Sequence, residues 1–316
     1  RVRRVWLLGR LGAAGPDRPR DHERDPAADH WRDDHLGLLK KPLARAALVA
    51  VLATGAAAAD EKPDALTREI ARIETGIGGV VGVAARHLGS GAERSYHAQL
   101  RFPMASTYKI AIGACVLERV GQGEFTLVSQ IAVEPRLQST SSILSDSFPH
   151  HGLAVSVQNL LELMLTSSDN TATDVLLDAI GGPAAVRRCI GHAGLADLRV
   201  DRTTAQILRQ FAGLPDPPDP ATSFFDQFQS LPAPSRELPY LEDGRGPHYL
   251  AFERDPRDQA TPQAMTRFLE KIWRDDWPTR QGAAMLRGIL ARSKEPVRIG
   301  RGLPAGTPLA HKTGTL

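Results

Sequence analysis

The sequence is 316 residues long, with 42% hydrophobic and 24% charged residues, a composition typical of a globular protein with a large core. Its formal net charge of +3 comes from the N-terminal part alone, because residues 60–316 carry 28 basic and 29 acidic residues. This part therefore has no basic excess, and the composition gives no support for a nucleic-acid partner.

The N-terminal residues form two segments that we leave out of the predicted fold. Residues 1–39 are rich in Arg, Asp, His and Pro and begin with Arg rather than Met, so we expect upstream sequence translated in error or a disordered extension. Residues 40–59 have the basic start, short apolar stretch and small-residue end of a secretory signal peptide (KKPLAR, AALVAVLA, AAA). We expect an exported protein, periplasmic or secreted, with no membrane segment after signal cleavage.

A helix and a hairpin are predicted next. Leu66, Ile70 and Ile73 share one helix face, and the glycines from Gly76 onward end that helix. The stretches VVGVAARHL and ERSYHA then predict two strands joined by a GSG turn. Those glycines include no Gly-Lys-Ser/Thr, so a phosphate-binding loop is not indicated.

From Phe102 to about Ile190 the sequence is mainly helical, and its first helix ends at Gly121. Ser106 precedes this helix and stands three residues before Lys109, so the two side chains can share a face. Unpaired amides at a helix start favour negative charge, which suits a nucleophile that creates an oxyanion. The alternative is a serine near a helix start followed by a solvated lysine, and spacing alone does not decide between them.

The second half of the chain contains a Pro-rich stretch, a further predicted helix and a predicted hairpin. Residues 211–236 are Pro-rich and predict a long loop with one short helix. Thr261 and Pro262 are a good cap and first-turn pair for a further helix. The stretches PVRIGRG and PLAHKTGTL at the end predict a strand hairpin.

The chain has two cysteines, Cys115 and Cys189, both in predicted helices. In an exported protein they can pair, and buried free thiols are an equally good reading. No Cys/His cluster has the spacing of metal ligands, so we expect no metal site.

Three motifs stand in order along the chain: Ser106-x-x-Lys109, Ser168-Asp169-Asn170 and Lys312-Thr313-Gly314. Alone, the second reads as a helix cap and the third as a strand end, but these readings are hard to sustain for all three. The sequence resembles the class A β-lactamases and related serine hydrolases, which share this set. The stretches RFPMASTYK, SSDNTATDVLLDAIGGP and DPRDQATPQAM are also similar to that family, and the resemblance covers most of residues 62–210 and 251–316.

The resemblance implies a two-domain α/β fold of the β-lactamase/transpeptidase type, with an antiparallel sheet flanked by helices and a mostly helical second domain. The α/β domain is expected from residues 60–101 and 263–316, the helical domain from 102–262, and the site in the cleft between them. Because the family continues beyond K-T-G with further strand and helix, we expect that the sequence is truncated at Leu316.

The resemblance also assigns catalytic roles. Ser106 would be the acylated nucleophile, and Lys109 its base if burial and neighbouring positive charge lower the lysine pKa from ~10.4. Ser168 would pass a proton to the leaving nitrogen. The backbone amides of Ser106 and Thr315 would form the oxyanion hole. Asn170 would bind the acylamino side chain of the substrate.

Substrate binding by the third motif follows from its charge. Lys312 would attract the substrate carboxylate and support the lowered pKa of Lys109, while Thr313 would donate a hydrogen bond to that carboxylate. No cofactor is needed for this chemistry. The expected partner is a small β-lactam or D-Ala-D-Ala-like molecule, and the protein is expected to be a monomer.

One position departs from the family pattern. Arg202 and Asp258 match the pair that brackets the family's Ω loop, here enlarged to an insertion at about 203–257. Thr204 stands where the family has the glutamate that activates the deacylating water, and threonine is no general base near neutral pH. The candidate carboxylates of the insertion for this role are Glu237, Glu242, Asp243 and Glu253.

The function implied by the resemblance is exported β-lactam hydrolysis through an acyl-enzyme on Ser106. One alternative is a D-alanyl-D-alanine peptidase, or another amidase or esterase with the same acyl chemistry. A second alternative is a β-lactam-binding or sensor module that acylates without turnover, which Thr204 favours. A glutamate restored at position 204 is expected, from the sequence alone, to speed deacylation.

Overall fold

The computed structural model describes residues 64–232, 247–294 and 298–315. The predicted leader and signal segment lie outside this range, as does Leu316. The described residues from Ile70 onward belong to one compact unit. Of a second unit, Ala14–Glu69, only residues 64–69 are described, and they include the start of helix α2 (Ala65–Ile77). No helix in the described range is long and apolar enough to cross a membrane.

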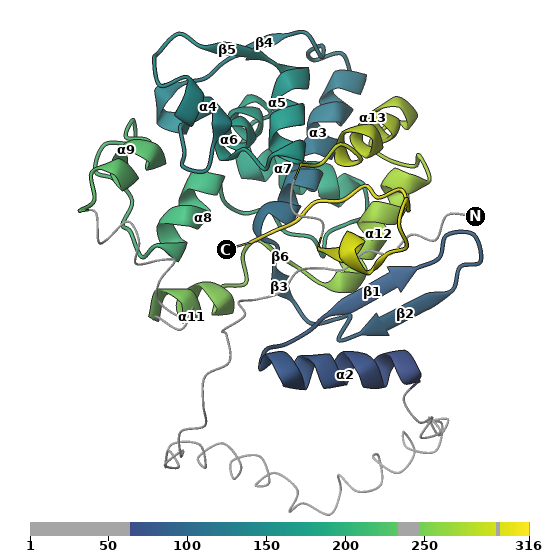
Figure 1. Ribbon diagram of the computed structural model, residues 1–316. Helices are drawn as coiled ribbons and strands as arrows, with labels where there is room; N and C mark the ends of the chain where they lie inside the picture. The colour runs from purple at the N-terminus through teal and green to yellow at the C-terminus, as the bar shows by residue number, and fades with distance from the viewer. Residues whose placement is uncertain (1–63, 233–246, 295–297, 316) are drawn as a thin grey trace, which may run out of the picture. The chain divides into compact units, whose positions relative to one another are not determined.

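Helices form most of the large unit (Figure 1). In chain order they are α3 (Lys109–Gly121), α4 (Ile143–Ser147), α5 (Val157–Thr166), α6 (Asn170–Ala179), α7 (Gly182–His192), α8 (Thr204–Phe211), α9 (Phe224–Gln229), α11 (Pro247–Arg254), α12 (Pro262–Trp273) and α13 (Arg280–Leu290). The 3-10 turns are η3 (Ala105–Tyr108), η4 (Pro135–Leu137) and η5 (Ile299–Gly302). Many helices begin after a Ser, Thr or Asp side chain that accepts a backbone N–H, as Thr261 does for α12.

Helix α3 is central to the hydrophobic core, and α5, α6, α7 and α13 pack against it. Its residues from Lys109 to Leu117 are all buried. The small Gly113 lets α3 approach the side chains of Leu165 and Leu286 on α5 and α13. A disulfide between Cys115 and Cys189 joins α3 to α7, which decides between the two readings of the cysteines.

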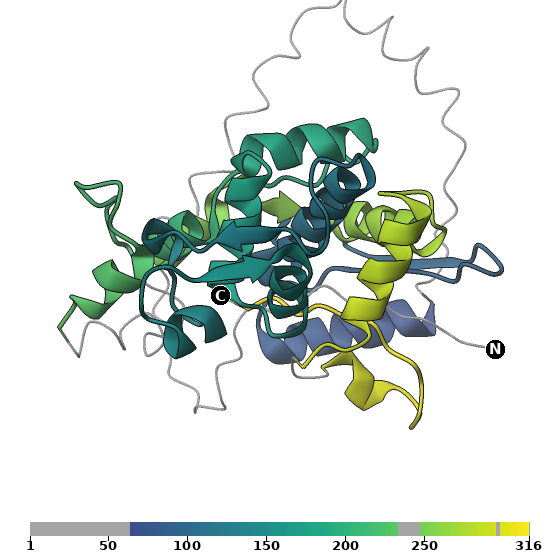
Figure 2. The same cartoon turned by 90° about the horizontal axis from the view of Figure 1, so that it is seen from above.

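The described strands form three separate antiparallel pairs. Strands β1 (Val83–Arg86) and β2 (Glu93–Tyr96) form the predicted hairpin. Strands β4 (Gln130–Ala132) and β5 (Ala154–Ser156) form a second pair, visible side by side in Figure 2. The pair important for the site is β3 (Phe102–Pro103) with β6 (Gln259–Ala260), because it fixes the chain immediately before Ser106 against the end of the insertion.

The predicted hairpin at the end of the chain is wrong in the described part. Residues 299–302 form η5, and residues 303–315 contain no strand. Gly300 and Gly302 favour a turn over a β ladder, and a strand needs a partner for its backbone groups. One such group, the His311 N–H, instead donates to the Leu290 carbonyl oxygen at the end of α13, at 3.2 Å.

The insertion at about 203–257 contains more helix than a long loop would. Its described parts include α8, α9 and α11. Helix α9 is the short helix predicted within the Pro-rich stretch. Helix α8 begins with a capping box, in which Thr203 and Gln206 exchange side-chain and backbone hydrogen bonds, a local signal that was present in the sequence.

Candidate active site

Ser106 lies in η3, at the step from β3 into α3. The Thr107 hydroxyl donates to the Met104 carbonyl oxygen at 2.6 Å, and the Lys109 N–H donates to the Ser106 carbonyl oxygen. Ala105 has a φ of 46°, a left-handed conformation that costs an alanine about 1 kcal/mol. This kinked turn places the half-buried Ser106 immediately before the N-terminus of α3, where backbone amides favour a developing negative charge.

Lys109 Nζ is enclosed by oxygen atoms of the S-D-N segment. The residue is 0% exposed, and Nζ lies 2.7 Å from the Ser168 carbonyl oxygen, 2.6 Å from Asn170 Oδ1 and 3.3 Å from Ser168 Oγ. A neutral amine would give its two N–H groups to the carbonyl and amide oxygens and keep its lone pair for a hydroxyl. An ammonium would give its third N–H to Ser168 Oγ. The surroundings therefore suit both protonation states, as a proton-transferring group requires.

Asp169 holds the S-D-N segment in place through hydrogen bonds. Its buried carboxylate caps helix α6 and also accepts from the Ser142 hydroxyl at 2.9 Å and the Leu144 N–H at 3.1 Å. Asn170 Nδ2 donates to the Thr140 carbonyl oxygen at 2.9 Å. Residues 140–144 thus hold Asp169 and Asn170, so the amide oxygen beside Lys109 is placed by a connected set of hydrogen bonds.

The K-T-G segment reaches the turn that carries Ser106. A Cβ added to Gly314 would lie 2.7 Å from the Met104 carbonyl oxygen, closer than side chains tolerate, and 3.2 Å from Ser106 N, which is a tight contact. Figure 1 shows the yellow C-terminal segment running toward this region, next to β3 and β6. Glycine at position 314 is what permits this close approach of two backbones.

The other residues of this segment differ in exposure. Lys312 is buried, and its Nζ donates to the Thr313 carbonyl oxygen at 2.8 Å. Thr315 is exposed, and its hydroxyl accepts from Arg298 Nη2 at 2.8 Å. The structure therefore brings the first and third motifs together through their backbones at Gly314.

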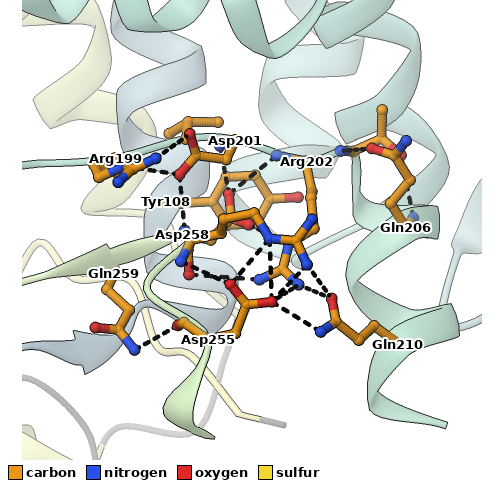
Figure 3. Close-up of polar contacts among 12 residues, drawn as sticks. Tyr108, Arg199, Asp201, Arg202, Gln206, Gln210, Asp255, Asp258 and Gln259 are labelled. Carbon is orange, nitrogen blue, oxygen red and sulfur yellow. Dashed lines mark hydrogen bonds and ion pairs between the residues drawn. The ribbon is translucent and has the colours of Figure 1, made fainter. Parts of the chain in front are cut away.

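Arg202 and Asp258 join the start and the end of the insertion (Figure 3). Arg202 Nε lies 2.5 Å from Asp258 Oδ2, and both side chains are 4% exposed. Asp258 Oδ1 accepts the N–H of Asp201 at 2.7 Å and of Arg202 at 3.2 Å. Burial raises the pKa of Asp258, and these hydrogen bonds oppose the rise. The guanidinium also covers the Phe252 ring of α11, at 5.2 Å from its centroid.

Asp255 extends this network to α8 (Figure 3). Asp255 Oδ2 lies 3.3 Å from Arg202 Nη1 and 2.5 Å from Arg257 Nη2, and it accepts from Gln210 Nε2 at 2.8 Å. The hydrogen bond from Arg257 is the main cause that holds the pKa of Asp255 well below its usual value. Helix α8 is therefore held at Arg202, two residues before its first residue, and at Gln210, the residue before its last.

Thr204 lies in a buried group with Tyr108 and Asp174, which we call the 204 cluster. Its hydroxyl oxygen is 2.5 Å from the Tyr108 hydroxyl, and the Asp174 carboxylate accepts the N–H of Thr204 at 2.7 Å and of Ala205 at 2.9 Å. Burial raises the pKa of Asp174, opposed by hydrogen bonds from both amides and the Thr204 side chain and by the charge of Lys109. Burial also raises the pKa of Tyr108.

The sequence profile of the beta-lactamase enzyme family matches residues 64–316. The chain belongs to this family. Extended-spectrum beta-lactamase PER-1 of Pseudomonas aeruginosa is 29% identical over 217 residues, which cover 68% of this chain and 58% of that protein. The carbapenem-hydrolyzing beta-lactamase KPC of Klebsiella oxytoca is 34% identical over 137 residues, 43% of this chain and 46% of that protein. The chain spans about half the length of the curated relatives it matches.

Solved beta-lactamase structures have the same fold. The class A beta-lactamase of the last common ancestor of Gram-negative bacteria superposes with a TM-score of 0.62 and 30% identity, over 80% of each chain. A mutant of the chromosome-encoded beta-lactamase of Vibrio parahaemolyticus, with 23% identity over 76% of each chain, superposes with a TM-score of 0.58 and shows the fold alone. The predicted family and the two-domain α/β fold class are confirmed. The domain boundaries at 60–101, 102–262 and 263–316 stay predictions.

Within this beta-lactamase fold, Lys109 contacts Ser168 and Asn170, and Gly314 lies against the turn of Ser106, while the catalytic roles of the motif residues stay predictions. Three candidate carboxylates of the insertion lie outside the described residues: Glu237, Glu242 and Asp243. Glu253 is exposed on α11, where its backbone oxygen accepts from Gln259 Nε2 at 3.2 Å. Among the described residues, no group of three or more His, Cys, Asp or Glu is arranged to hold a metal ion.

Sequence reasoning missed two residues of the site, Tyr108 and Asp174. Weak signals were present for both. Tyr108 directly precedes Lys109 inside the first motif, and Asp174 follows Asn170 by four residues, which places both on one face of α6. Neither signal reveals that the two side chains meet at Thr204.

Proposed function

We propose that the protein is a class A-type serine β-lactamase that forms an acyl-enzyme on Ser106 and releases it slowly. The observation that carries this proposal is the enclosure of Lys109 by Ser168 and Asn170 immediately behind the turn of Ser106. This arrangement supplies a nucleophile, a buried base and a hydroxyl for proton transfer within one contiguous site. The beta-lactamase names of the relatives support a β-lactam as substrate.

In the proposed acylation, Lys109 as a neutral amine takes the proton of the Ser106 hydroxyl while Ser106 Oγ bonds to the carbonyl carbon of the lactam. The lactam C–N bond then breaks, and the nitrogen takes a proton that passes from Lys109 through Ser168. The backbone N–H groups of Ser106 and Thr315 stabilise the oxyanion. No metal or cofactor takes part in these steps.

Substrate binding is proposed for three side chains around this centre. Lys312 and Thr313 bind the substrate carboxylate, the first by charge and the second by a hydrogen bond. Asn170 binds the acylamino group, because its amide both donates and accepts. The substrate is proposed to be a small beta-lactam-like molecule, and the protein is proposed to be a monomer.

A second candidate function is a β-lactam-binding or sensor protein that keeps its acyl group. The specific observation in its favour is Thr204, which carries no carboxylate and whose hydroxyl contacts Tyr108 inside the 204 cluster. Such a side chain cannot activate water near neutral pH. The two candidates share acylation and differ only in the rate of release.

Export is proposed from two observations. Residues 40–59 have the pattern of a signal peptide. The disulfide between Cys115 and Cys189 supports an oxidising compartment, since such bonds are rare in the cytosol. The protein is therefore proposed to act in the periplasm or outside the cell.

The test of the proposed function is acylation itself. The full chain is incubated with a chromogenic cephalosporin, and colour and intact mass are followed together. We expect a mass increase of one opened lactam, abolished by Ser106→Ala and retained by Ser230→Ala, a matched change at an exposed position of the helix α9 C-cap.

The outcomes separate the candidates. Many turnovers with little adduct identify a hydrolase, and a persistent adduct identifies the acyl-keeping protein. No adduct and no colour would rule out a β-lactam substrate, and an adduct that persists on Ser106→Ala or maps to Ser168 would contradict the assigned nucleophile.

A further inference from the structure

Helix α9 of the insertion reaches the segment that holds Asn170. The Phe225 N–H, in the first turn of α9, donates to the Gln138 carbonyl oxygen at 3.2 Å. Gln138 and its neighbour Ser139 are buried. Thr140 follows them, and its carbonyl oxygen accepts from Asn170 Nδ2 at 2.9 Å. The insertion therefore contacts the chain two residues away from a hydrogen-bond partner of the S-D-N motif.

Residues 138–140 are also bound to helix α6. The Ser139 N–H donates to Thr171 Oγ1 at 3.0 Å, and the same oxygen lies 2.7 Å from Ser145 Oγ. All three of these residues are buried. Because residues 138–140 are bound by both α6 and α9, their position depends on both helices, and one of the two belongs to the insertion.

Arg209 of helix α8 holds α9 in place. Its Nε donates to Gln227 Oε1 at 2.8 Å, and its Nη2 donates to the Thr222 carbonyl oxygen at 3.2 Å. The guanidinium also lies over the Phe224 ring, 5.9 Å from the ring centroid. Both Arg209 and Phe224 are buried, so solvent does not compete for these contacts. Arg209 therefore fixes where α9 meets residues 138–140.

We propose that Arg209 and Gln227 are positioning residues that, through α9, orient the Asn170 amide toward the acylamino group of the substrate. This inference rests on the proposed function, in which Asn170 binds that group. It assigns the insertion a role in selecting β-lactams that carry an acylamino side chain.

The physical reason is the way in which the Asn170 amide divides its hydrogen bonds. Its Oδ1 accepts from Lys109 Nζ at 2.6 Å, and one N–H of its Nδ2 goes to the Thr140 carbonyl oxygen. The second N–H can donate to the acyl carbonyl oxygen of the substrate. Because the amide is planar, a shift of residues 138–140 would turn this second N–H away. Lys109 would keep its contact with the Ser168 carbonyl oxygen.

The test uses two penicillins that differ in the acyl group, benzylpenicillin and 6-aminopenicillanic acid. The second has the same fused rings and carboxylate, and it carries an amino group in place of the acylamino group. The full chain is mixed with each compound, and rapid-quench intact mass gives the efficiency of acylation. The readout is the ratio of the efficiency with benzylpenicillin to that with 6-aminopenicillanic acid, because a loss of folded protein or of general reactivity cancels in this ratio.

Four variants are compared with the unmodified chain. Arg209→Met removes the guanidinium, Gln227→Leu removes its acceptor, and Gln227→Glu keeps an acceptor at the same place. Both changes at Gln227 lose the hydrogen bond from its Nε2 to the Pro215 carbonyl oxygen, so this pair isolates the contact with Arg209. Arg267→Met is the control, because it removes an exposed arginine of helix α12 that pairs with Asp197.

We expect Arg209→Met and Gln227→Leu to lower the ratio about three- to tenfold, the range for loss of one neutral hydrogen bond. Gln227→Glu and Arg267→Met should change it by less than about twofold, because the contact between Arg209 and α9 is kept. An unchanged ratio in Arg209→Met or Gln227→Leu, including equal losses with both penicillins, would overturn the proposal. A ratio lowered as far in Gln227→Glu as in Gln227→Leu would overturn it too. If Arg209→Met does not fold, the pair at Gln227 decides.

Hydrogen exchange gives a readout that needs no substrate. The amides of residues 138–142 should exchange faster in Gln227→Leu than in Gln227→Glu, and at the unmodified rate in Arg267→Met. Equal exchange in the two variants at Gln227 would overturn the link between α9 and Asn170. Faster exchange in Gln227→Leu, together with no adduct from either penicillin on the unmodified chain, would instead contradict the proposed function and leave that link supported.

Discussion

Lys109 and Lys312 have the same formal charge, but we predict that Lys109 transfers a proton and that Lys312 binds the substrate carboxylate. Lys109 Nζ is held by two carbonyl-type oxygens and lies near a hydroxyl, while Lys312 is a positive charge on the K-T-G segment. Lys109→Arg should slow acylation by about 10²-fold or more, because a guanidinium does not give up its proton in a protein. Lys312→Arg should stay within about tenfold, since carboxylate attraction needs only a positive charge.

The measurement is the rate of adduct formation by rapid-quench mass spectrometry, with the melting temperature of each variant as a control for folding. Equal losses of acylation rate in the two variants would contradict the division of roles. A Lys109→Arg variant that acylates normally would remove Lys109 from the proton-transfer step.

At this residue scale, the sequence allows prediction of the motif residues and not of the 204 cluster. Ser106, Lys109 and Asn170 are recognisable because each motif keeps its chemistry within a few residues. The Tyr108–Thr204 contact joins positions 96 residues apart, and the contact of Thr204 with Asp174 joins positions 30 apart. Such contacts depend on how α6, α8 and η3 pack, which no local pattern encodes.

At the element scale, the insertion is a helical structure fastened at both ends. The sequence pattern predicts the Arg202–Asp258 pair but not the contacts of Asp255 with Arg202 and Gln210, because these residues are far apart in the sequence and meet only in the fold. The hairpin predicted for the chain end is wrong in the described part, where residues 303–315 contain no strand and the His311 N–H donates to the Leu290 carbonyl oxygen. Local propensity gave way to tertiary contacts in both cases.

The Asp255 network predicts how the fold responds to acid. Its carboxyl has a folded pKa below the unfolded value of ~3.9, chiefly through Arg257, so it binds fewer protons when folded. The stabilisation is therefore present above about pH 4 and is lost as pH falls further. Asp255→Asn should lower Tm at pH 7 and reduce the additional loss of Tm between pH 5 and pH 2.5.

Melting curves across this pH range test the network. The control is Asp146→Asn, which removes an exposed carboxylate on α4. A variant at Asp255 whose Tm falls with acid as steeply as that of the unmodified chain would show that the network does not contribute to acid sensitivity.

At the scale of the whole molecule, the disulfide ties together parts of the core that the site depends on. It connects α3, which begins at Lys109, to α7, and α7 packs against the S-D-N helix α6. The two cysteines are 74 residues apart in sequence, and both are buried. Spacing could not decide whether they pair, because pairing requires the two helices to lie next to each other.

The last prediction concerns this disulfide. Closing a loop of this length restricts the unfolded chain, and the expected stabilisation is roughly 4 kcal/mol, within the range of about 2–5 kcal/mol for native disulfides. Replacing Cys115 and Cys189 together by alanine should lower Tm by roughly 10 °C. A thiol reductant should lower Tm of the unmodified chain by a similar amount and leave the double variant unchanged, which separates loss of the bond from loss of packing. If reductant has no effect on the unmodified chain under conditions where a thiol assay shows both cysteines reduced, the disulfide contributes no stability.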